Sequence, residues 1–406
     1  MSSRTSSLIS NGTLLQSIES TDYGDFIDNA SRRKALAAAQ ALVRRLQHPI
    51  DAVWDVALVY PALYSALKVG VDRNIFSRLD EDDGHPKSTT ELACGGDVVV
   101  LRRMLRHLAA MNFIDELGPD IWGRTRLSSA LTQREVFAHI DFVGDGSQLA
   151  FTGLPTFLKE VKYHDPSNAT NGNWQRVIGS GKTYFEWLAE RPREQQTFWD
   201  LMDGVASQPG SWTDVYPVET IFSGNNAHCA LVVDVGGAEG RDMQTFVQRF
   251  PEASGRVVLQ DQQAVIKTVL HLQNEGVIPM AHDFFTEQPI KEYCTIGKIG
   301  YPATTRPCLP DRLHGRPEDK AREILQNLKP AFVRGHSRLV VNEVVLPPRG
   351  ATSDQTSLDL TMMALVSGGE RSEEAWSNLI ESCGFRVLGF YHSLASREEV
   401  IEAELA

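Results

Sequence analysis

The sequence has little cysteine, and the cysteines that it has form no recognisable pattern. Its 406 residues contain five cysteines, Cys94, Cys229, Cys294, Cys308 and Cys383. They are scattered, odd in number and without the CxxC or Cys/His spacing of a zinc site, which argues against a disulfide framework and against structural zinc. No other metal is expected, because the acidic residues are not gathered as a magnesium site would require. Reduced thiols indicate a cytoplasmic protein.

Long apolar runs and an excess of positive charge are also missing. No stretch approaches the ~18 consecutive apolar residues of a membrane span, and the Ser/Thr-rich N-terminus lacks the apolar core of a signal peptide. The net charge is −12, with both signs interspersed. This pattern gives no broad attraction to nucleic acid or to an anionic membrane. Neither partner is expected, and a small neutral or aromatic substrate fits better.

The first part of the chain is mainly helical. Residues 1–30 are polar and predicted to be a disordered tail, followed by a helical domain over residues 31–150 whose first helix is capped by Ser31. Within residues 70–132, two short helices precede a two-stranded segment with Gly-Pro-Asp at its turn. That order is typical of a winged-helix module.

Two interpretations of this module are open. Its second helix carries basic residues that bind DNA in one interpretation, and that form the solvated face of a dimerisation domain in the other. The acidic residues 80–83 precede the module and there is no basic excess, which favours dimerisation. We therefore expect a homodimer. The basic residues are Arg102, Arg103, Arg106 and His107.

Residues 151–223 are predicted to be a helical region rich in aromatic side chains. Such side chains line an apolar substrate pocket or form an ordinary core, and the pattern alone leaves both possibilities open. The residues that we select as candidates for substrate binding are Phe185, Trp187, Phe198 and Met202, together with Met363 from later in the chain.

Residues 224–406 alternate short apolar runs with helical segments. The runs LVVDV, GRVVLQD, EGVIPMAHDF and SRLVVNEVVLP are strand candidates, and helical patterns separate several of them. Alternation of this kind predicts a parallel sheet with right-handed crossovers. The fold class is therefore α/β, with a ligand expected at the carboxyl ends of the strands.

The sharpest local motif is the glycine-rich turn in LVVDVGGAEGRD. An apolar strand ends near Asp234, Gly236 and Gly237 allow a tight turn against a ligand, and Gly240 opens the next helix. Asp261 ends the following strand, where its carboxylate can accept hydrogen bonds from ribose hydroxyls. This pattern fits NAD or S-adenosylmethionine, and a turn without a ligand is the remaining alternative.

Features outside the glycine turn favour S-adenosylmethionine. Asp283 and Phe284 follow the third strand, where a carboxylate can meet an adenine amino group and an aromatic ring can cover the base. No second half with phosphate-binding glycines is present, as NAD would require. A positively charged sulfonium also suits acidic surroundings.

Several segments, in this order, resemble the plant and fungal small-molecule O-methyltransferases. They are LRRMLRHLAAMNFIDE, DVYPVE, VDVGGAEG, LQD, HDFFTEQP, DKAREILQNLKPAF, NEVVLP, GGERSEEAW and GFRVLGFYHS. The resemblance implies a C-terminal Rossmann-like domain that binds S-adenosylmethionine and an N-terminal winged-helix dimerisation domain. It implies methyl transfer to a hydroxyl of an aromatic or polyketide-like secondary metabolite, with S-adenosylhomocysteine as the product.

The resemblance also assigns roles to residues. It implies that Gly236, Asp261, Asp283 and Phe284 bind the cofactor. His314 would remove the proton of the substrate hydroxyl, since catalysis needs a base with a pKa near neutrality. Glu343 and Glu370 would brace that histidine or the substrate.

The sequence departs from the family around His314. The segment EYCTIGKIGYPATTRPCLPDRLHGR is longer than usual, and Gly-Arg follows the histidine in place of Asp-Trp. Either YCTIGKI forms the strand and an unusual loop follows, or the segment comes from an imperfect gene model. Two other functions therefore stay open. One is dehydration or pericyclic ring closure on bound S-adenosylmethionine, and the other is a non-enzymatic role as a regulator or inactive partner. The groups that would polarise a substrate carbonyl in the first are His139, Arg306, Arg312 or Arg316.

Overall fold

The computed structural model describes residues 11–166, 168, 170–206, 212–222, 230–291, 295–298, 318–392 and 399–406. The chain forms two compact units, Met1–Val53 and Trp54–Ala406. The boundaries expected at residues 150 and 223 both fall inside the second unit. The division at these two residues stays a prediction.

The first unit is helical, and it corrects two predictions. The stretch predicted as a disordered tail contains α1 (Asn11–Ser20) and the 3-10 turn η1 (Tyr23–Asp25). Helix α2 (Asn29–Leu46) is capped by Asp28, whose Oδ1 accepts the Ser31 N–H at 2.6 Å. Ser31 is therefore not the cap. Both residue types can cap a helix, and Asp28 takes the role because the helix begins before Ser31.

The winged-helix module predicted over residues 70–132 is confirmed. Its three short strands pair antiparallel in the order β1-β3-β2, and its core is built on Leu105, Leu108 and Trp122, which are fully buried. The elements from α3 onward are α3 (Pro49–Trp54), the π-helical η2 (Asp55–Val59), α4 (Tyr60–Asp72), α5 (Ile75–Asp80), η3 (Asp82–Gly84), β1 (Lys87–Ser88), α6 (Thr89–Ala93), α7 (Val98–Ala110), β2 (Ile114–Gly118), β3 (Ile121–Arg124) and α8 (Arg126–Ala130).

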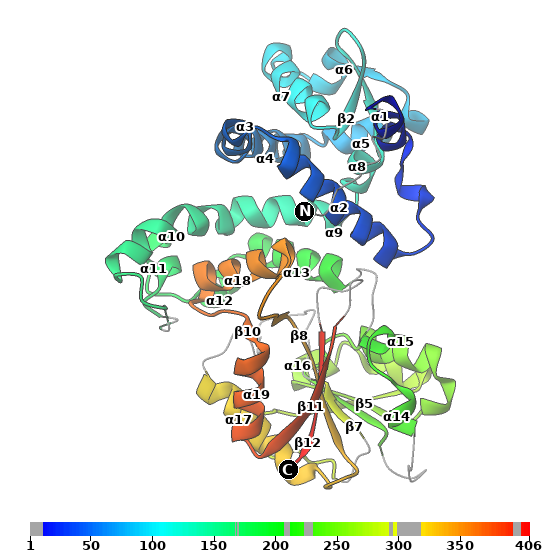
Figure 1. The fold of residues 1–406 in the computed structure, drawn as a ribbon, viewed down its shortest axis with the longest axis vertical. Helices are drawn as coiled ribbons and strands as arrows, with labels where there is room; N and C mark the ends of the chain where they lie inside the picture. The colour runs from blue at the N-terminus through cyan, green and yellow to red at the C-terminus, as the bar shows by residue number, and fades with distance from the viewer. Residues whose placement is uncertain are drawn as a thin grey trace, which may run out of the picture. The chain divides into compact units, whose positions relative to one another are not determined.

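A layer of helices combines segments that are far apart in the chain (Figure 1). Asn173 joins them, because its Nδ2 donates to the carbonyl oxygens of Ala150 at 2.8 Å and of Ala364 at 3.0 Å. The helices are α9 (Arg134–Phe142), the π-helical η4 (Val143–Ser147), α10 (Gln148–Glu160), α11 (Asn173–Ile178), α12 (Tyr184–Ala189), α13 (Pro192–Ala206) and, from much later, α18 (Ser353–Val366).

The rest of the second unit is a seven-stranded sheet with the order β11-β12-β8-β7-β4-β5-β6. The predicted parallel arrangement is confirmed for β4 to β8, and β11 and β12 add an antiparallel edge. The strands are β4 (Val232–Val235), β5 (Val257–Asp261), β6 (Val277–Ala281), β7 (Thr295–Lys298), β8 (Arg338–Glu343), β11 (Phe385–Tyr391) and β12 (Glu399–Leu405). Strand β7 falls within YCTIGKI, as one of the two alternatives for that segment expects, and the loop that follows lies outside the described residues.

Helices and short turns cover both faces of this sheet. One apolar core contains Leu325, Val341 and Trp376, and the other contains Phe246 and Leu259. The elements are η5 (Trp212–Asp214), α14 (Glu219–Phe222), α15 (Arg241–Arg249), η6 (Pro251–Ala253), α16 (Gln263–Ile266), η7 (Leu270–Glu275), α17 (Glu318–Leu328), η8 (Lys329–Ala331), α19 (Glu373–Ser382) and a separate two-stranded pair, β9 (Val345–Leu346) and β10 (Arg371–Ser372).

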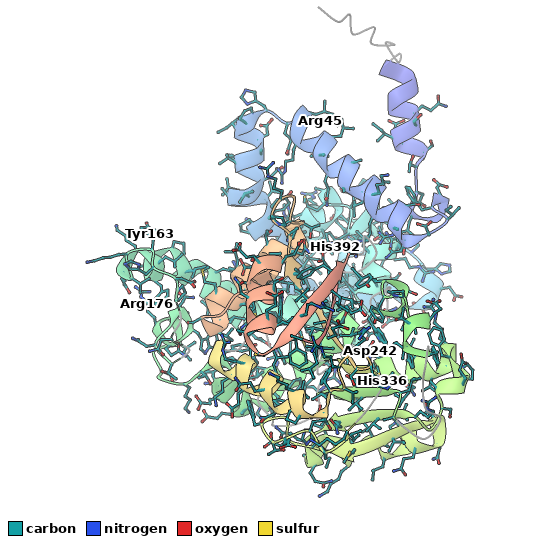
Figure 2. All side chains as sticks on the ribbon, turned by 60° about the horizontal axis from the view of Figure 1, so that its bottom comes forward. Arg45, Tyr163, Arg176, Asp242, His336 and His392 are labelled. Carbon is teal, nitrogen blue, oxygen red and sulfur yellow. The ribbon has the colours of Figure 1, made fainter. Side chains whose placement is uncertain are left out.

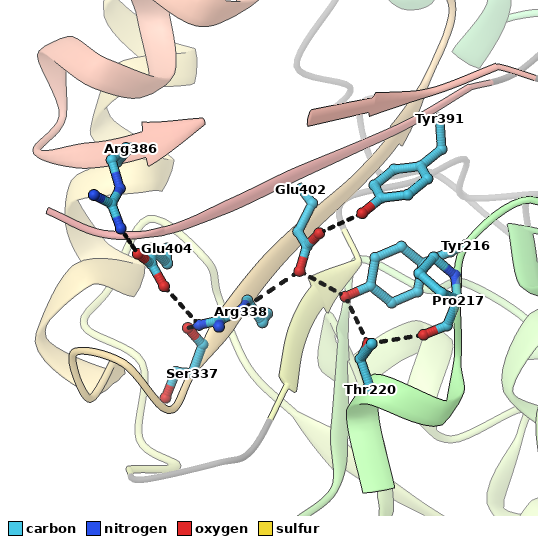
Figure 3. Close-up of polar contacts among 9 residues, drawn as sticks. All are labelled: Tyr216, Pro217, Thr220, Ser337, Arg338, Arg386, Tyr391, Glu402 and Glu404. Carbon is cyan, nitrogen blue, oxygen red and sulfur yellow. Dashed lines mark hydrogen bonds and ion pairs between the residues drawn. The ribbon is translucent and has the colours of Figure 1, made fainter. Parts of the chain in front are cut away.

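Strand β12 buries glutamates, and a network of partners stabilises them (Figure 3). Glu402 accepts hydrogen bonds from the hydroxyls of Tyr216 at 3.0 Å and Tyr391 at 2.7 Å, and it pairs with Arg338. Arg338 also pairs with Glu404. Burial raises the pKa of Tyr391 to about 12. Tyr216 belongs to the DVYPVE motif, so this network holds that motif against the sheet.

One helical stretch is long and apolar enough to cross a membrane when judged by length and composition alone. It runs over 24 residues, Pro49–Asp72, through α3, η2 and α4. Only 11% of its most apolar window is buried. The expectation of no membrane contact stays a prediction.

Candidate functional site

The glycine-rich turn after β4 is built so closely that side chains are excluded from it. A Cβ on Gly237 would lie 2.2 Å from Asp234 Oδ2 and 2.4 Å from Leu259 Cδ1. Gly236 and Gly240 have φ of +74° and +72°, which favours glycine. A Cβ on Gly240 would also lie 2.7 Å from Leu259. The turn needs glycine at all three positions.

Ala238 occupies a position in this turn where the family often has a third glycine. Its φ is +50°, in the left-handed region that side chains with a Cβ disfavour by roughly 1–2 kcal/mol. Its N–H donates to Asp261 Oδ2 at 2.9 Å. The turn therefore keeps its shape, with local strain, and is tied to the neighbouring strand.

Asp261 is held ready to accept further hydrogen bonds. It is 8% exposed, and its Oδ1 accepts the Gln262 N–H at 2.7 Å while Oδ2 accepts that of Ala238. Burial raises the pKa of this carboxyl, and the two backbone N–H groups lower it to a smaller extent. Each carboxylate oxygen can accept more than one hydrogen bond, so both can still accept one from a ribose hydroxyl.

The segment after β6 brings the other two predicted cofactor residues to the same place. Its start is tied to β5, because His282 N–H donates to the Asp261 carbonyl at 2.9 Å. Asp283 is exposed, and the ring of Phe284 lies 3.8 Å from where a Gly236 Cβ would be. The glycine turn, Asp261 and Phe284 therefore lie next to one another at the carboxyl edge of the sheet.

This arrangement fits S-adenosylmethionine. Glycine at position 237 keeps the turn tight, the Asp261 carboxylate can accept hydrogen bonds from a ribose, and the Phe284 ring lies beside Gly236, where it can cover a base. Of the predicted cofactor residues, Asp234 is buried beneath the turn and supports it. Its predicted role in cofactor binding stays a prediction.

The two glutamates that the resemblance selects lie just before the paired strands β9 and β10. Glu343 ends β8 and is 2% exposed. The pairing of Arg371 with Val345 in β10 and β9 places Glu370 beside Val344, the residue after Glu343. His314, the predicted base, lies outside the described residues. Its role stays a prediction.

Asp359 is a residue of this site that the sequence analysis missed. Its Oδ1 accepts the backbone N–H of Glu370 at 2.8 Å, which holds the turn before β10 against helix α18. The two residues are eleven positions apart, and no helix or strand period links them. Only the tertiary structure brings them together.

A histidine–glutamate pair lies at the same edge of the sheet. His392 follows β11 (Figure 2), and its Nδ1 is 2.7 Å from Oε2 of the buried Glu399. Gln355 of α18 donates to the other oxygen of Glu399 at 3.4 Å. Glu399 is paired in register with Glu343. The sequence analysis quoted GFRVLGFYHS, which contains His392, but did not select the histidine, because nothing along the chain pairs it with Glu399.

The five candidate substrate residues belong to one cluster in the helical layer. Phe198 is one of the buried residues of this cluster, and Phe185, Trp187, Met202 and Met363 are half-buried and pack against the cluster. The ring centroids of Phe185 and Phe198 are 5.9 Å apart with the rings edge to face. Helix α18 contributes Met363 and also carries Asp359 and Gln355, so it connects the aromatic cluster to the carboxylates.

Residues on which the pericyclic and the DNA-binding interpretations depend have partners within the fold. His139 Nδ1 lies 3.1 Å and 3.2 Å from the carbonyl oxygens of Glu135 and Val136 in its own helix. Arg102 pairs with Asp120 and lowers the pKa of that carboxyl. Arg306, Arg312 and Arg316 lie outside the described residues. Within the described part of the chain, no group of three or more His, Cys, Asp or Glu residues could hold a metal ion.

Comparisons of sequence identify the family. A family model described as an O-methyltransferase domain matches residues 162–386. The chain is 32% identical over 400 residues to O-methyltransferase mfmE of Annulohypoxylon moriforme, covering 97% of this chain and 95% of that protein. It is also 32% identical over 362 residues to demethylsterigmatocystin 6-O-methyltransferase of Aspergillus parasiticus, covering 86% and 88%.

Solved structures share the fold and identify the cofactor. The complex of LepI with S-adenosylmethionine superposes with a TM-score of 0.83 at 25% identity, covering 97% of this chain and 98% of that one. OxaC, solved with S-adenosylhomocysteine and oxaline, has a TM-score of 0.76 at 20% identity, covering 97% of each. The α/β fold with a Rossmann-like domain is thereby confirmed. The chain belongs to the O-methyltransferase family, and it is an S-adenosylmethionine-dependent O-methyltransferase that acts in secondary metabolism.

Proposed function

We propose that the enzyme methylates a hydroxyl group of an aromatic or polyketide-like molecule at the carboxyl edge of the sheet. The observation that carries the proposal is the position of Glu343 and Glu370 just before the paired strands β9 and β10, with Glu343 ending β8 at the edge that also bears the glycine turn and Asp261. A buried and a half-buried carboxylate there suit a reaction that removes a proton beside a cationic cofactor. The name of the Aspergillus parasiticus relative describes a reaction of this kind.

The protein residues handle the proton. His314 is proposed as the base that accepts the proton of the substrate hydroxyl, with Glu343 and Glu370 orienting the imidazole or the substrate. Asp359 is proposed to position Glu370 through its backbone N–H. When bound, S-adenosylmethionine supplies an electrophilic methyl group on a positively charged sulfur. The side chains must hold the hydroxyl in line with that methyl, since positioning accounts for much of the rate.

The aromatic cluster is proposed to bind the rest of the substrate. Phe185, Trp187 and Phe198 present ring edges and faces, and Met202 and Met363 are flexible fillers. Rings and thioethers of this kind favour a flat, apolar molecule over a sugar or a charged metabolite.

The first experiment is calorimetric titration with S-adenosylmethionine and S-adenosylhomocysteine, followed by a labelled-methyl assay against a panel of phenols and polyketides. His314→Ala is the variant, and His139→Ala is the matched control. We expect methyl transfer that the first substitution abolishes and the second preserves. Full activity in His314→Ala would contradict the assignment of the base, and a panel without any methylated product would contradict the proposed substrate class.

A second function is suggested by one specific likeness. A solved structure described as a pericyclic reaction enzyme has a TM-score of 0.83 at 25% identity over 97% of this chain. The alternative proposal is therefore dehydration or ring closure with S-adenosylmethionine bound and unreacted. Conversion of substrate without formation of S-adenosylhomocysteine would support it, whereas stoichiometric S-adenosylhomocysteine would rule it out.

We also propose a cytoplasmic homodimer that uses the N-terminal helical region. Apolar side chains at the start of the second unit are exposed, with Trp54 at 58%, Val56 at 61% and Leu58 at 51%. Sedimentation should give twice the monomer mass, and Val56→Asp should lower it to the monomer. Binding of the monomer to phospholipid vesicles instead would assign this surface to a membrane. A fluorescent fusion in a fungal cell would test the location.

A further inference from the structure

Two glutamine side chains face each other in the interior of the sheet domain. Gln260 of β5 and Gln288 of the HDFFTEQP segment are both 0% exposed. Gln260 Nε2 donates to Gln288 Oε1 at 2.9 Å, and Gln288 Nε2 donates to Gln260 Oε1 at 2.8 Å. This is a reciprocal pair of good hydrogen bonds away from water.

The pair joins the two segments that carry the predicted cofactor residues. Gln260 directly precedes Asp261, and successive side chains of a strand point to opposite faces, so Gln260 lies beneath the sheet edge that Asp261 forms. Gln288 closes the loop that begins with Asp283 and Phe284. The pair therefore connects the ribose side of the site to the adenine side.

Helix α17 holds the same loop at two further points. Gln288 N–H donates to the Asn327 carbonyl at 3.1 Å, and Asn327 Nδ2 donates to the Phe284 carbonyl at 3.4 Å. Ile290 N–H donates to Gln288 Oε1 at 3.2 Å. The loop is thus tied by polar contacts at its first aromatic residue and at its end.

Apolar side chains of similar size would fill this space without any need for partners. A buried amide that loses its partner is unfavourable, whereas replacing both partners by apolar groups of the same shape can be nearly neutral for stability. What the amides add is direction, because two hydrogen bonds allow only one relative placement of strand and loop.

We propose that Gln260 and Gln288, supported by Asn327, are positioning residues that make the cofactor site selective for adenine. The proposal rests on the assignment of Asp283 to the adenine amino group. A carboxylate accepts a hydrogen bond from that amino group, and it repels the carbonyl oxygen that hypoxanthine has in the same place. The discrimination requires that the loop hold Asp283 in place relative to Asp261.

The test is calorimetric binding of S-adenosylhomocysteine and of S-inosylhomocysteine, its hypoxanthine analogue, to the full-length protein. We expect the native protein to prefer the adenine ligand. Gln288→Leu should weaken its binding about tenfold, because Gln260 loses both hydrogen bonds to the loop and the loop loses its tie to β5. Binding of the hypoxanthine ligand should change little, so the ratio of the two affinities falls toward one.

Three further variants separate positioning from folding. The double variant Gln260→Leu with Gln288→Leu should regain thermal stability relative to Gln288→Leu but stay unselective. Asn327→Ala keeps the glutamine pair and should lose about threefold in adenine affinity. Gln175→Leu is the matched control, since Gln175 is a buried glutamine that accepts from Gly172 N–H at 2.8 Å in the helical layer. It should lower the melting temperature and leave selectivity unchanged.

Two results would overturn the proposal. One is an unchanged preference for adenine in Gln288→Leu and in the double variant, which would make the pair structural only. The other is equal binding of both ligands by the native protein, which would mean that the loop does not recognise the base. Failure of the native protein to bind either ligand is a different result, because it would contradict the proposed cofactor residues themselves.

Discussion

The cofactor side and the substrate side of this enzyme are built by different means. The cofactor side is built mainly from backbone groups. Glycines allow the tight turn, N–H groups orient Asp261, and the loop after β6 is hydrogen-bonded to β5. On the substrate side, side chains from α12, α13 and α18 form an aromatic cluster. A site for an invariant ligand can depend on backbone geometry, whereas a site whose ligand differs among relatives depends on side chains that can be exchanged.

Gly237→Ala should disrupt cofactor binding more than any other change. The alanine Cβ would lie 2.2 Å from Asp234 Oδ2, so the turn must open. We expect binding of S-adenosylhomocysteine to weaken more than about 100-fold, with a stability loss of roughly 1–3 kcal/mol. Calorimetry and thermal unfolding measure both. Gly181→Ala is the control, since a Cβ there meets nothing within 4 Å. Normal binding by Gly237→Ala would show that the turn does not hold the cofactor.

Phe198→Ala should weaken substrate binding and leave cofactor binding unchanged. Phe198 is one of the buried residues of the aromatic cluster, and such a truncation lowers stability by about 3–5 kcal/mol. Chemical denaturation measures the loss. At temperatures where the variant is folded, its affinity for S-adenosylhomocysteine should match the native value while its substrate KM rises. A parallel loss of cofactor affinity would contradict the separation of the two sides.

Asp359→Ala tests the connection between the two sides. Without the carboxylate, Glu370 N–H loses its acceptor and the turn before β10 is released from α18. We expect kcat to fall about tenfold with little change in cofactor affinity. Asp359→Asn keeps an oxygen that can accept the same bond and should retain most of the activity. Equal losses in both variants would point to the negative charge of Asp359 instead.

The pH dependence of cofactor binding tests the role of Asp261 on the cofactor side. Because burial raises the pKa of Asp261, this carboxyl takes up a proton at a higher pH than an exposed aspartate does. The charged form, present above that pKa, accepts hydrogen bonds from ribose hydroxyls, so affinity should fall as the pH is lowered through it. Calorimetry between neutral and mildly acidic pH measures the decline. Asp261→Asn should bind weakly at every pH, and a pH-dependent decline in that variant would assign the titration to another group.

Ala238→Gly should give the smallest effect, and a favourable one. The substitution relieves a left-handed backbone at φ +50°. The gain is offset in part by the greater freedom of glycine in the unfolded chain, so we expect a stabilisation under about 1 kcal/mol. Differential scanning calorimetry with and without S-adenosylhomocysteine can detect it. A loss of stability would mean that the Ala238 methyl group contributes packing that outweighs the strain.

The parts of the site that lie close together in the chain were predictable. The turn from Gly236 to Gly240 follows its strand directly, and Asp261 ends the next strand, so strand and turn patterns were sufficient. The winged helix and the strands β4, β5, β6 and β8 follow from the same local patterns. Within the tail predicted over residues 1–30, helix α1 forms from Asn11 to Ser20, and residues 1–10 lie outside the described residues.

Contacts between distant segments were not predictable. Strands β9 and β10 have two residues each, too few for a pattern, yet their pairing sets Glu370 beside Val344. The hydrogen bond from Glu370 to Asp359 and that between Gln260 and Gln288 join residues without any shared period. The base, His314, lies outside the described residues and stays a prediction.

The sequence by itself determined the fold class, the cofactor turn and the family. These depend on the spacing of apolar residues and glycines over short stretches of the chain, which the sequence shows directly. Only the tertiary structure decided which buried polar groups meet: Glu402 with Tyr216, Glu399 with His392, and Gln260 with Gln288. A buried polar group is stable only beside a partner, and that partner is defined by how the sheet and its helices pack, not by distance along the chain.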